Sequence, residues 1–245
     1  MPFTFSHPAI VLPFRLLPKS WISLTGLIVG SVVPDFEKFI NMEPGNTISH
    51  TKVGVLLFNL PMGVLLSFLF HTMIRDPFVE HLPRFLERRL ISIERINWVK
   101  YFKKHNIKIC ISIIIGAVLH IGWDSMTHKS GLIVRLFPQL NRVVEFGNYE
   151  GAVFSLLDFA STIIGGLYVL CTILLLPTKD VLSVKDVRRK LNFWFIVVVI
   201  SICVLIIRAL AGLGQNWHWD IIISSITAFL IGIIVASLVV KYKPS

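Results

Sequence analysis

The stretch Ile221-Ile-Ile-Ser-Ser-Ile-Thr-Ala-Phe-Leu-Ile-Gly-Ile-Ile-Val-Ala-Ser-Leu-Val-Val240 contains no Asp, Glu, Lys or Arg over 20 residues. An α-helix rises about 1.5 Å per residue, so about 20 apolar residues cross a hydrocarbon core about 30 Å thick. Backbone N–H and C=O groups in lipid must be paired within the segment itself. The stretch is therefore predicted to be a membrane-spanning helix.

Four further stretches lack Asp, Glu, Lys and Arg: Val53–Ile74, Ile109–Trp123, Phe159–Thr178 and Leu191–Ile207. Leu191–Ile207 reaches spanning length by continuing past Arg208, and Ile109–Trp123 reaches it by running through Asp124. Core helices of soluble proteins rarely hold more than about 12–14 apolar residues in a row, which disfavours that alternative. We predict an all-α, polytopic membrane helix bundle with about five spanning helices.

The N-terminal region holds two short apolar runs, Pro8–Leu17 and Ser20–Pro34. Each is too short to cross a membrane, so we predict an interfacial or re-entrant helical hairpin. The chain is predicted to be a single membrane-embedded domain, residues 1–245. Its parts are residues 1–52 (the hairpin and metal-site segment), residues 53–128 (two spans and a basic amphipathic loop) and residues 152–240 (three further spans). The three cysteines lie inside predicted spans, where they are expected to pack as small apolar residues.

The chain is both apolar and basic, with 54% hydrophobic residues and a net charge of +10. Five crossings leave seven basic residues on the side of the N-terminus and sixteen on the other side. The positive-inside rule makes the second side cytoplasmic, and the amphipathic loop 75–107 is predicted to lie on that surface. The excess of basic residues thus lies on the cytoplasmic side, next to the lipid headgroups. We therefore expect membrane lipids as partners, and no nucleic acid. We expect a multi-pass membrane protein whose more basic side faces the cytoplasm.

The clearest polar motif within a span is His120-Ile-Gly-Trp-Asp124-Ser-Met-Thr-His128. A spacing of four residues places all three ionisable side chains on one helical face. Imidazole nitrogen and carboxylate oxygen both bind zinc-type ions at about 2.0–2.2 Å, so residues on adjacent turns can share one ion. Ionisable residues near a membrane core cost about 2.5–3.5 kcal/mol on insertion scales and are functional candidates.

The topology places further groups on the outer face with this motif. A divalent metal site is predicted from His7, Asp35, His50, His120 and Asp124. For Glu37 and His128, the roles of ligand, outer partner and surface residue stay open. Any one of these residues taken alone also fits a packing histidine or a helix-capping aspartate.

Two further ionisable residues, near the outer ends of other spans, each have two possible roles. Arg208 either extends to the membrane interface or binds an anionic phosphate beside the metal site. Asp158 is a further ligand or a partner of Arg208.

Five segments resemble an uncharacterised bacterial family of multi-pass membrane proteins, catalogued as domain of unknown function 4184. They are Pro2-Phe-Thr-Phe-Ser-His7-Pro8-Ala-Ile-Val-Leu-Pro13, Gly30-Ser-Val-Val-Pro34-Asp35-Phe-Glu37, Ser49-His50-Thr51, Leu69-Phe70-His71 and His120-Ile-Gly-Trp-Asp124-Ser-Met-Thr-His128. Together they cover the first 130 residues in the expected order, whereas the C-terminal half is similar mainly in hydropathy. The resemblance implies a location in the bacterial cytoplasmic membrane.

The order of groups also resembles membrane-bound predicted metal-dependent hydrolases and, more distantly, zinc-dependent phospholipases C. Asp35 and His50 are 15 residues apart, and His120 and Asp124 have the His-x-x-x-Asp spacing of those enzymes. The resemblance implies that Asp35, His50, His120 and Asp124 hold one metal ion, which is zinc in those enzymes. It also implies that His7 and Asp124 help to hold a second.

Two functions from different classes fit these residues. The first is a metal-dependent hydrolase that opens to the outer face and acts on a phosphodiester or ester of a phospholipid or lipid-linked substrate. Asp35 or Glu37 would take the proton of the attacking water, and Arg208 would bind substrate. The second is a non-catalytic transporter or scaffold in which the His and Asp residues form a buried polar network. The oligomeric state stays open.

Overall fold

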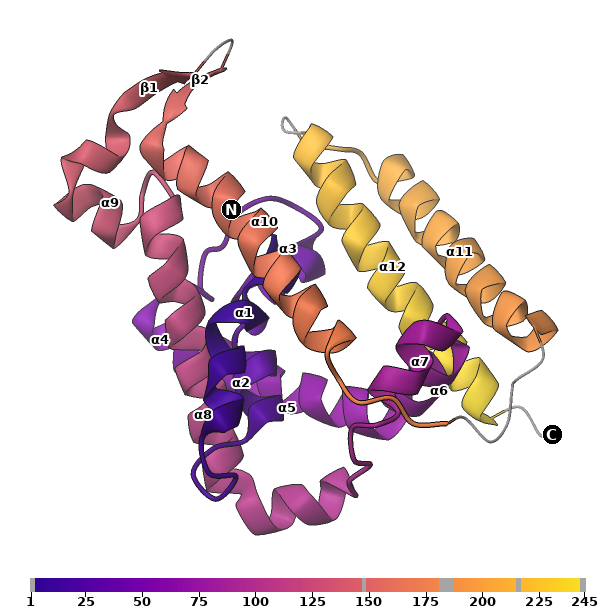
Figure 1. The fold of residues 1–245 in the computed structure, drawn as a ribbon. Helices are drawn as coiled ribbons and strands as arrows, with labels where there is room; N and C mark the ends of the chain where they lie inside the picture. Colours follow the sequence, from indigo (N-terminus) through magenta and orange to yellow (C-terminus); the bar gives the residue numbers. More distant parts are fainter. Residues whose placement is uncertain (1–2, 147–148, 181–186, 215–216, 243–245) are drawn as a thin grey trace. The chain divides into compact units, whose positions relative to one another are not determined.

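A computed structural model describes residues 3–146, 149–180, 187–214 and 217–242 of the chain. The described residues are helical for most of their length (Figure 1). Their exception is a hairpin of two short antiparallel strands, β1 (Val143–Phe146) and β2 (Tyr149–Ala152), in which Val143 pairs with Ala152. The predicted all-α class is confirmed.

Five segments among the described residues are long and apolar enough to cross a membrane, as predicted. They are Lys52–His81, Trp98–Thr127, Val153–Leu174, Val187–Leu210 and Trp217–Lys241. The last four correspond to single helices: α8 (Trp98–Thr127), α10 (Val153–Leu174), α11 (Val187–Leu210) and α12 (Trp217–Tyr242). The chain is therefore a multi-pass membrane protein.

The first span contains two π-helical segments. It runs through α4 (Lys52–Gly54), η4 (Val55–Asn59), α5 (Leu60–Leu69), η5 (Phe70–Ile74) and α6 (Arg75–His81), of which η4 and η5 are π-helical. A proline follows each π-helical segment closely, Pro61 after η4 and Pro77 after η5. Proline has no N–H and its ring collides with the carbonyl four residues earlier, so a wider turn relieves the collision.

Helix boundaries differ from the edges of the uncharged stretches, because backbone hydrogen bonds and not charges end a helix. Helix α8 runs through Asp124 to Thr127, and α11 continues past Arg208 to Leu210, as predicted. The predicted amphipathic loop 75–107 is helical at both ends, and its placement on the cytoplasmic surface stays a prediction. Residues 75–81 form α6, and residues 98–107 belong to α8, whose backbone bends at His105 (φ −131°, ψ 24°). Between them lies α7 (Arg84–Leu90).

The N-terminal region consists of short helices. They are α1 (Pro8–Val11), α2 (Leu24–Gly30) and α3 (Phe36–Asn41), with 3-10 turns at Thr4–Ser6, Leu12–Leu16 and Val33–Asp35. Ser23 caps α2, since its Oγ accepts a hydrogen bond from the Gly26 N–H at 3.2 Å. None of these helices is long enough to span a membrane, which agrees with a hairpin of short helices. Its interfacial or re-entrant placement stays a prediction.

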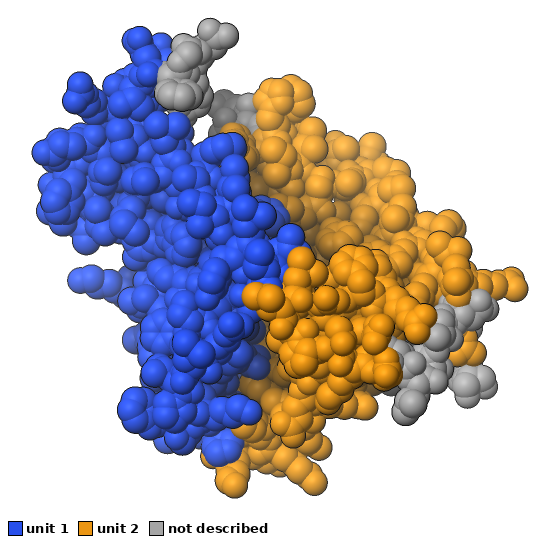
Figure 2. Space-filling view, in the orientation of Figure 1, with its two compact units in different colours: residues 1–35, 48–64, 105–172 blue, residues 36–47, 65–104, 173–245 orange. Residues whose placement is uncertain are grey.

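The described chain divides into two compact units, each assembled from three separate segments (Figure 2). Unit 1 comprises residues 1–35, 48–64 and 105–172, and unit 2 comprises residues 36–47, 65–104 and 173–245. Unit 1 also holds α9 (Leu132–Leu136) and a 3-10 turn at Pro138–Asn141, which lead into the strand hairpin. The prediction of a single membrane-embedded domain stays a prediction.

Glycines bring two helices of unit 1 into backbone contact. A Cβ atom on Gly26 of α2 would lie 2.8 Å from the Ile109 carbonyl oxygen of α8. A Cβ atom on Gly116 of α8 would lie 2.8 Å from the Ser31 nitrogen, directly after α2. Such close approach of small residues is a common way for membrane helices to associate. It places the end of α2 against the part of α8 that carries His120.

Unit 2 is built on an antiparallel pair of helices, α11 and α12. Phe193 and Val197 of α11 pack with Ile233 and Ala236 of α12 in a buried apolar cluster. The hydroxyl of Ser201 donates to the Ala228 carbonyl at 3.1 Å across the pair.

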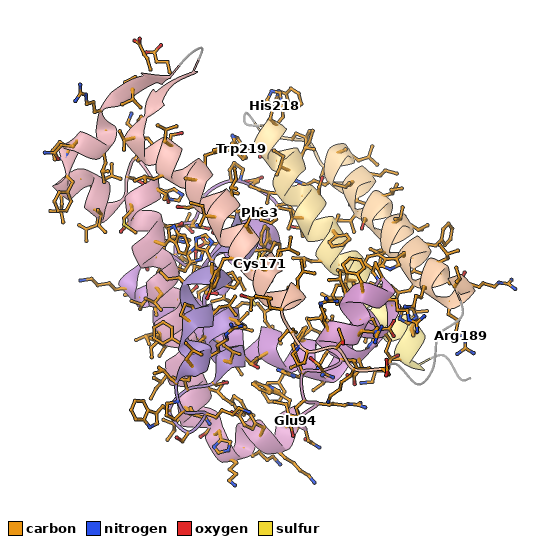
Figure 3. All side chains as sticks on the ribbon, viewed as in Figure 1. Phe3, Glu94, Cys171, Arg189, His218 and Trp219 are labelled. Carbon is orange, nitrogen blue, oxygen red and sulfur yellow. The ribbon has the colours of Figure 1, made fainter. Side chains whose placement is uncertain are left out.

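Large apolar side chains project outward from the spanning helices (Figure 3). Phe159 and Leu167 on α10, and Phe195 and Ile206 on α11, are each more than half exposed. Such a surface is unfavourable in water and matches a lipid environment. The three cysteines lie in helices, where Cys171 and Cys203 are exposed like the apolar side chains around them and Cys110 is partly buried.

Candidate metal centre

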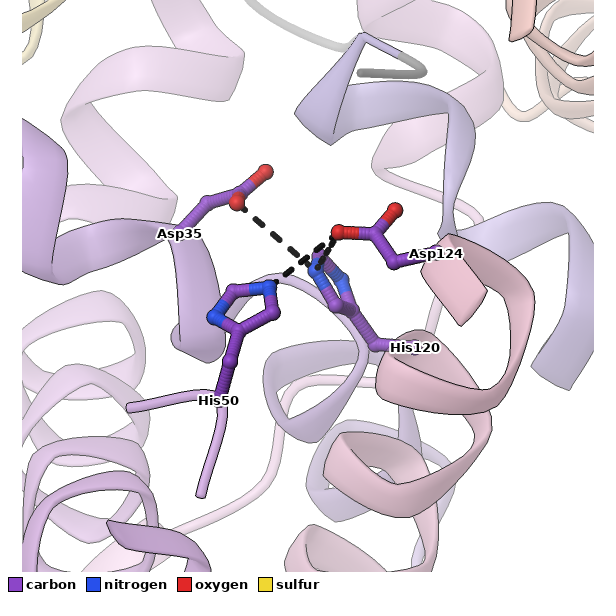
Figure 4. A group of neighbouring side chains, drawn as sticks. All are labelled: Asp35, His50, His120 and Asp124. Carbon is purple, nitrogen blue, oxygen red and sulfur yellow. Dashed lines mark hydrogen bonds and ion pairs between the residues drawn. The ribbon is translucent and has the colours of Figure 1, made fainter. Parts of the chain in front are cut away.

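Four side chains of unit 1 converge on one point (Figure 4). Asp35, His50, His120 and Asp124 each offer one ligand atom, and these atoms all lie within 4.8 Å of one another. Asp35 ends the 3-10 turn after α2, His50 directly precedes Thr51, the N-cap of α4, and the other two lie on adjacent turns of α8. We call this group the four-ligand cluster. It is the set that the resemblance implied for one metal ion.

The Asp124 carboxylate is the hub of this region. Its Oδ2 lies 3.1 Å from His50 Nε2 and 3.5 Å from His120 Nε2. Its Oδ1 lies 3.1 Å from His7 Nε2 and 3.8 Å from His128 Nδ1. The two oxygens therefore face different pairs of histidines, which is the arrangement that a bridging carboxylate needs.

The cluster is almost closed to solvent. Asp35, His120 and Asp124 are buried, whereas the side chain of His50 is 23% exposed and that of His128 is 28% exposed. Two carboxylates without compensating positive charge are very unfavourable in such a place. Compensation comes either from protonated imidazoles or from a bound cation.

The position of His120 fits a metal ligand. Its Nδ1–H donates to the Ser31 carbonyl at 2.7 Å, which leaves the lone pair on Nε2. That Nε2 is buried without a hydrogen-bond partner among the described residues, 3.7 Å from Asp35 Oδ1 and 3.5 Å from Asp124 Oδ2. A lone pair aimed between carboxylate oxygens is unfavourable unless a cation lies between them. The donor set of two imidazoles and two carboxylates suits a divalent ion.

The remaining ligands are also held by neighbours. The Thr4 hydroxyl donates to Asp35 Oδ2 at 2.5 Å, leaving Oδ1 toward His120. The Ser49 hydroxyl lies 3.1 Å from His50 Nδ1, so His50 Nε2 faces Asp124. Such outer contacts orient metal ligands and raise their affinity for the ion.

His7 and His128 lie beside the four-ligand cluster and not within it. The His7 ring stacks on His120 with a centroid distance of 3.8 Å. Burial, and secondarily the neighbouring His120, lowers the pKa of the His7 imidazole below its usual 6.5, which favours the neutral form that binds metals. His128 Nδ1 donates to the Asp124 backbone carbonyl at 2.9 Å. Their predicted roles as metal ligands stay predictions.

Two other predicted site residues belong to unit 2, outside the four-ligand cluster. Glu37 Oε1 accepts hydrogen bonds from the backbone N–H and the hydroxyl of Thr47, at 2.8 and 2.5 Å. Arg208 Nη2 lies 3.3 Å from Glu43 Oε1 and 3.6 Å from Asp220 Oδ2. Both side chains thus have partners within unit 2. The base role for Glu37 and the substrate role for Arg208 stay predictions.

Asn59 is not among the predicted site residues, yet it is buried in the π-helical segment η4. Its Nδ2 donates to the Ser49 carbonyl at 2.8 Å and so fixes the turn that carries His50. One sequence feature could have identified Asn59 as a candidate: it is the single amide side chain in the 22-residue uncharged stretch Val53–Ile74.

The variant Asn59→Leu is expected to bind zinc about 10–100-fold more weakly than wild type, because leucine has a similar volume but cannot hold the turn before His50. Competition with a chromophoric chelator measures this affinity. Asn106→Leu, an exposed position on α8, is the matched control and should bind zinc like wild type. Wild-type affinity in Asn59→Leu would show that Asn59 has no part in orienting His50.

A small pocket adjoins the cluster on the side of His50. Its volume is about 280 Å³, and its walls are formed by His50, Thr51, Lys52, Val55, Val118 and Ile121. It therefore combines one cationic side chain with an apolar wall, next to an exposed edge of the cluster. The sequence analysis assigned no role to Lys52.

A family model described as "Domain of unknown function (DUF4184)" matches residues 1–240. The chain belongs to this family, as the resemblance of its first 130 residues indicated. No curated protein and no solved structure matches the chain. The comparisons thus do not show the similarity to metal-dependent hydrolases or to zinc-dependent phospholipases C.

Proposed function

We propose that this DUF4184 family member is a zinc-type metal-dependent hydrolase of the bacterial cytoplasmic membrane, with its site on the outer side. Its substrate is a phosphodiester or ester of a lipid, cleaved near headgroup depth. One observation carries the proposal: the buried Asp124 carboxylate faces four imidazoles, two of which belong with Asp35 to a cluster of metal-ligand geometry.

The residues of the site have two kinds of role, as metal ligands and as proton acceptor. Asp35, His50, His120 and Asp124 hold one divalent ion, and His7 with Asp124 Oδ1 contributes to a second. When bound, such an ion supplies Lewis acidity, which polarises a phosphoryl or acyl oxygen and makes water more acidic. Asp35 is favoured over Glu37 as proton acceptor, because Asp35 belongs to the four-ligand cluster and Glu37 lies outside it.

The pocket beside His50 supports an amphiphilic substrate. The Lys52 ammonium attracts an anionic group, while Val55, Val118 and Ile121 contact apolar chains. A phospholipid carries both features, and the exposed edge of His50 is one of the accessible sides of the cluster.

The test is hydrolysis of a mixed bacterial phospholipid extract by purified protein in detergent. Zinc-loaded wild type is expected to release either a headgroup, with or without its phosphate, or a fatty acid, and chelation should stop the release. Lys52→Ala should raise KM about tenfold, the effect of losing about 1.4 kcal/mol of binding, with unchanged zinc content. Lys129→Ala, a basic residue outside the pocket, is the control. Zinc-loaded protein that releases neither product from any lipid would overturn the proposal.

A further inference from the structure

Unit 2 contains a larger pocket whose role is independent of the metal centre. Its volume is about 690 Å³, within the range of about 300–1,000 Å³ that is usual for small-molecule sites. Its walls come from the end of the first span, the segment that enters α8 and the last turns of α12.

The topology places this pocket at a membrane surface. Consecutive spans run in opposite directions, so the end of Lys52–His81, the start of Trp98–Thr127 and the end of Trp217–Lys241 lie on the same side. We therefore expect the pocket near headgroup depth, on the side to which the topology assigns sixteen basic residues of the sequence.

Charges of both signs line the pocket. Arg95 and Lys241 are cationic, and Asp76 and Glu80 are anionic. Arg95 Nη2 lies 2.6 Å from Asp76 Oδ2, yet the Arg95 side chain is 78% exposed and has five N–H donors in all. Lys241 Nζ donates to the Thr72 carbonyl at 2.6 Å, which holds the ammonium at the pocket wall. The balanced charges suit a ligand that is itself zwitterionic.

An unpaired donor lies in the same wall. Trp98 is buried and stacks on His71 with a centroid distance of 4.3 Å and an interplanar angle of 9°. Its Nε1–H has no hydrogen-bond partner among the described residues. A buried indole N–H normally finds an acceptor, and an anionic ligand in this pocket would bring acceptor oxygens to the wall that contains Trp98.

We propose that this pocket binds a phosphoethanolamine group, as carried by the headgroup of a zwitterionic phospholipid. Arg95 and Lys241 contact the phosphate, and the acidic side chains, chiefly Glu80, accept N–H donors of the primary ammonium. A choline headgroup has no such N–H donors, and a glycerol headgroup has no positive charge. The pocket should therefore distinguish among the three.

The experiment uses the full chain in detergent, titrated separately with short-chain phosphatidylethanolamine, phosphatidylcholine and phosphatidylglycerol. Native mass spectrometry counts bound lipid. The ethanolamine lipid should bind at least about tenfold more tightly than the other two. Arg95→Ala and Glu80→Gln should each lose about tenfold in affinity. The matched controls Arg84→Ala and Glu94→Gln, exposed residues outside the pocket wall, should bind like wild type.

A further variant and a soluble probe complete the test. Val99→Trp fills the pocket from an exposed position and should block binding without disturbing the charged residues. Soluble phosphoethanolamine that binds as tightly as the lipid would support the site and assign its ligand to a soluble compound. Equal binding of the three lipids, or wild-type binding by Val99→Trp and both charge variants, would overturn the proposal.

Discussion

Asp124→Asn is expected to reduce the zinc content of the purified protein to below about a tenth of the wild-type value. The Asp124 carboxylate lies within 3.8 Å of nitrogen atoms from four histidines, so its loss removes a charged neighbour from all four. Loss of a contact outside the ligand shell typically lowers metal affinity 10–100-fold, so loss of a shared ligand should lower zinc affinity by more than about 100-fold. Asparagine keeps the size of the side chain, so packing is preserved while the charge is lost.

Metal analysis by mass spectrometry, with zinc competition against a chelator, measures this effect. Asp158→Asn is the matched control, because Asp158 is also an aspartate within a span of unit 1 but lies outside the four-ligand cluster. It should retain wild-type zinc, which would also decide against Asp158 as a ligand. Stoichiometric zinc in Asp124→Asn would contradict the metal centre.

Thermal unfolding separates the metal centre from a purely structural network. A ligand that binds only the folded protein stabilises it by about 2.7 kcal/mol at a concentration 100 times its Kd. Zinc should therefore raise the melting temperature of wild type and not that of Asp124→Asn. In a non-catalytic polar network, the variant would melt at a lower temperature than wild type, and zinc would change neither protein.

The local part of the cluster could be predicted from sequence. His120 and Asp124 are four residues apart on one helix, and helix geometry alone places them on adjacent turns. His7 is 117 residues from Asp124, and no spacing rule joins residues that far apart. The predicted topology placed His7 and Asp124 on the same side of the membrane and no closer. The grouping of Asp35 and His50 with His120 and Asp124 came from the family resemblance.

The contacts that orient the ligands were beyond sequence reasoning. The partner of His120 Nδ1 is the backbone carbonyl of Ser31, and every residue has such a carbonyl. Its selection depends on how closely α2 approaches α8. The spacing of Gly26 and Gly30 in α2 is a signal for such an approach, although it does not identify the partner helix.

Gly116→Ala is expected to destabilise the protein by about 1–3 kcal/mol or more and to weaken zinc binding with it. The new Cβ atom would collide with the Leu27 carbonyl and lie 2.8 Å from the Ser31 nitrogen, and a backbone cannot yield as a side chain does. Moving α2 away from α8 also draws the Ser31 carbonyl from His120 Nδ1, so His120 loses the contact that orients its Nε2.

Gly122→Ala on the same helix is the matched control, because a Cβ atom there meets nothing within 4 Å. Alanine in a helix is favoured over glycine by about 0.8–1.0 kcal/mol, so this variant should be as stable as wild type or more stable. Melting temperature and zinc affinity, measured on both variants, test the coupling between the helix crossing and the site. A Gly116→Ala protein that melts and binds zinc like Gly122→Ala would contradict the close approach of the two helices. If instead Gly116→Ala loses stability and zinc affinity together, the crossing of α2 and α8 both holds unit 1 together and orients His120.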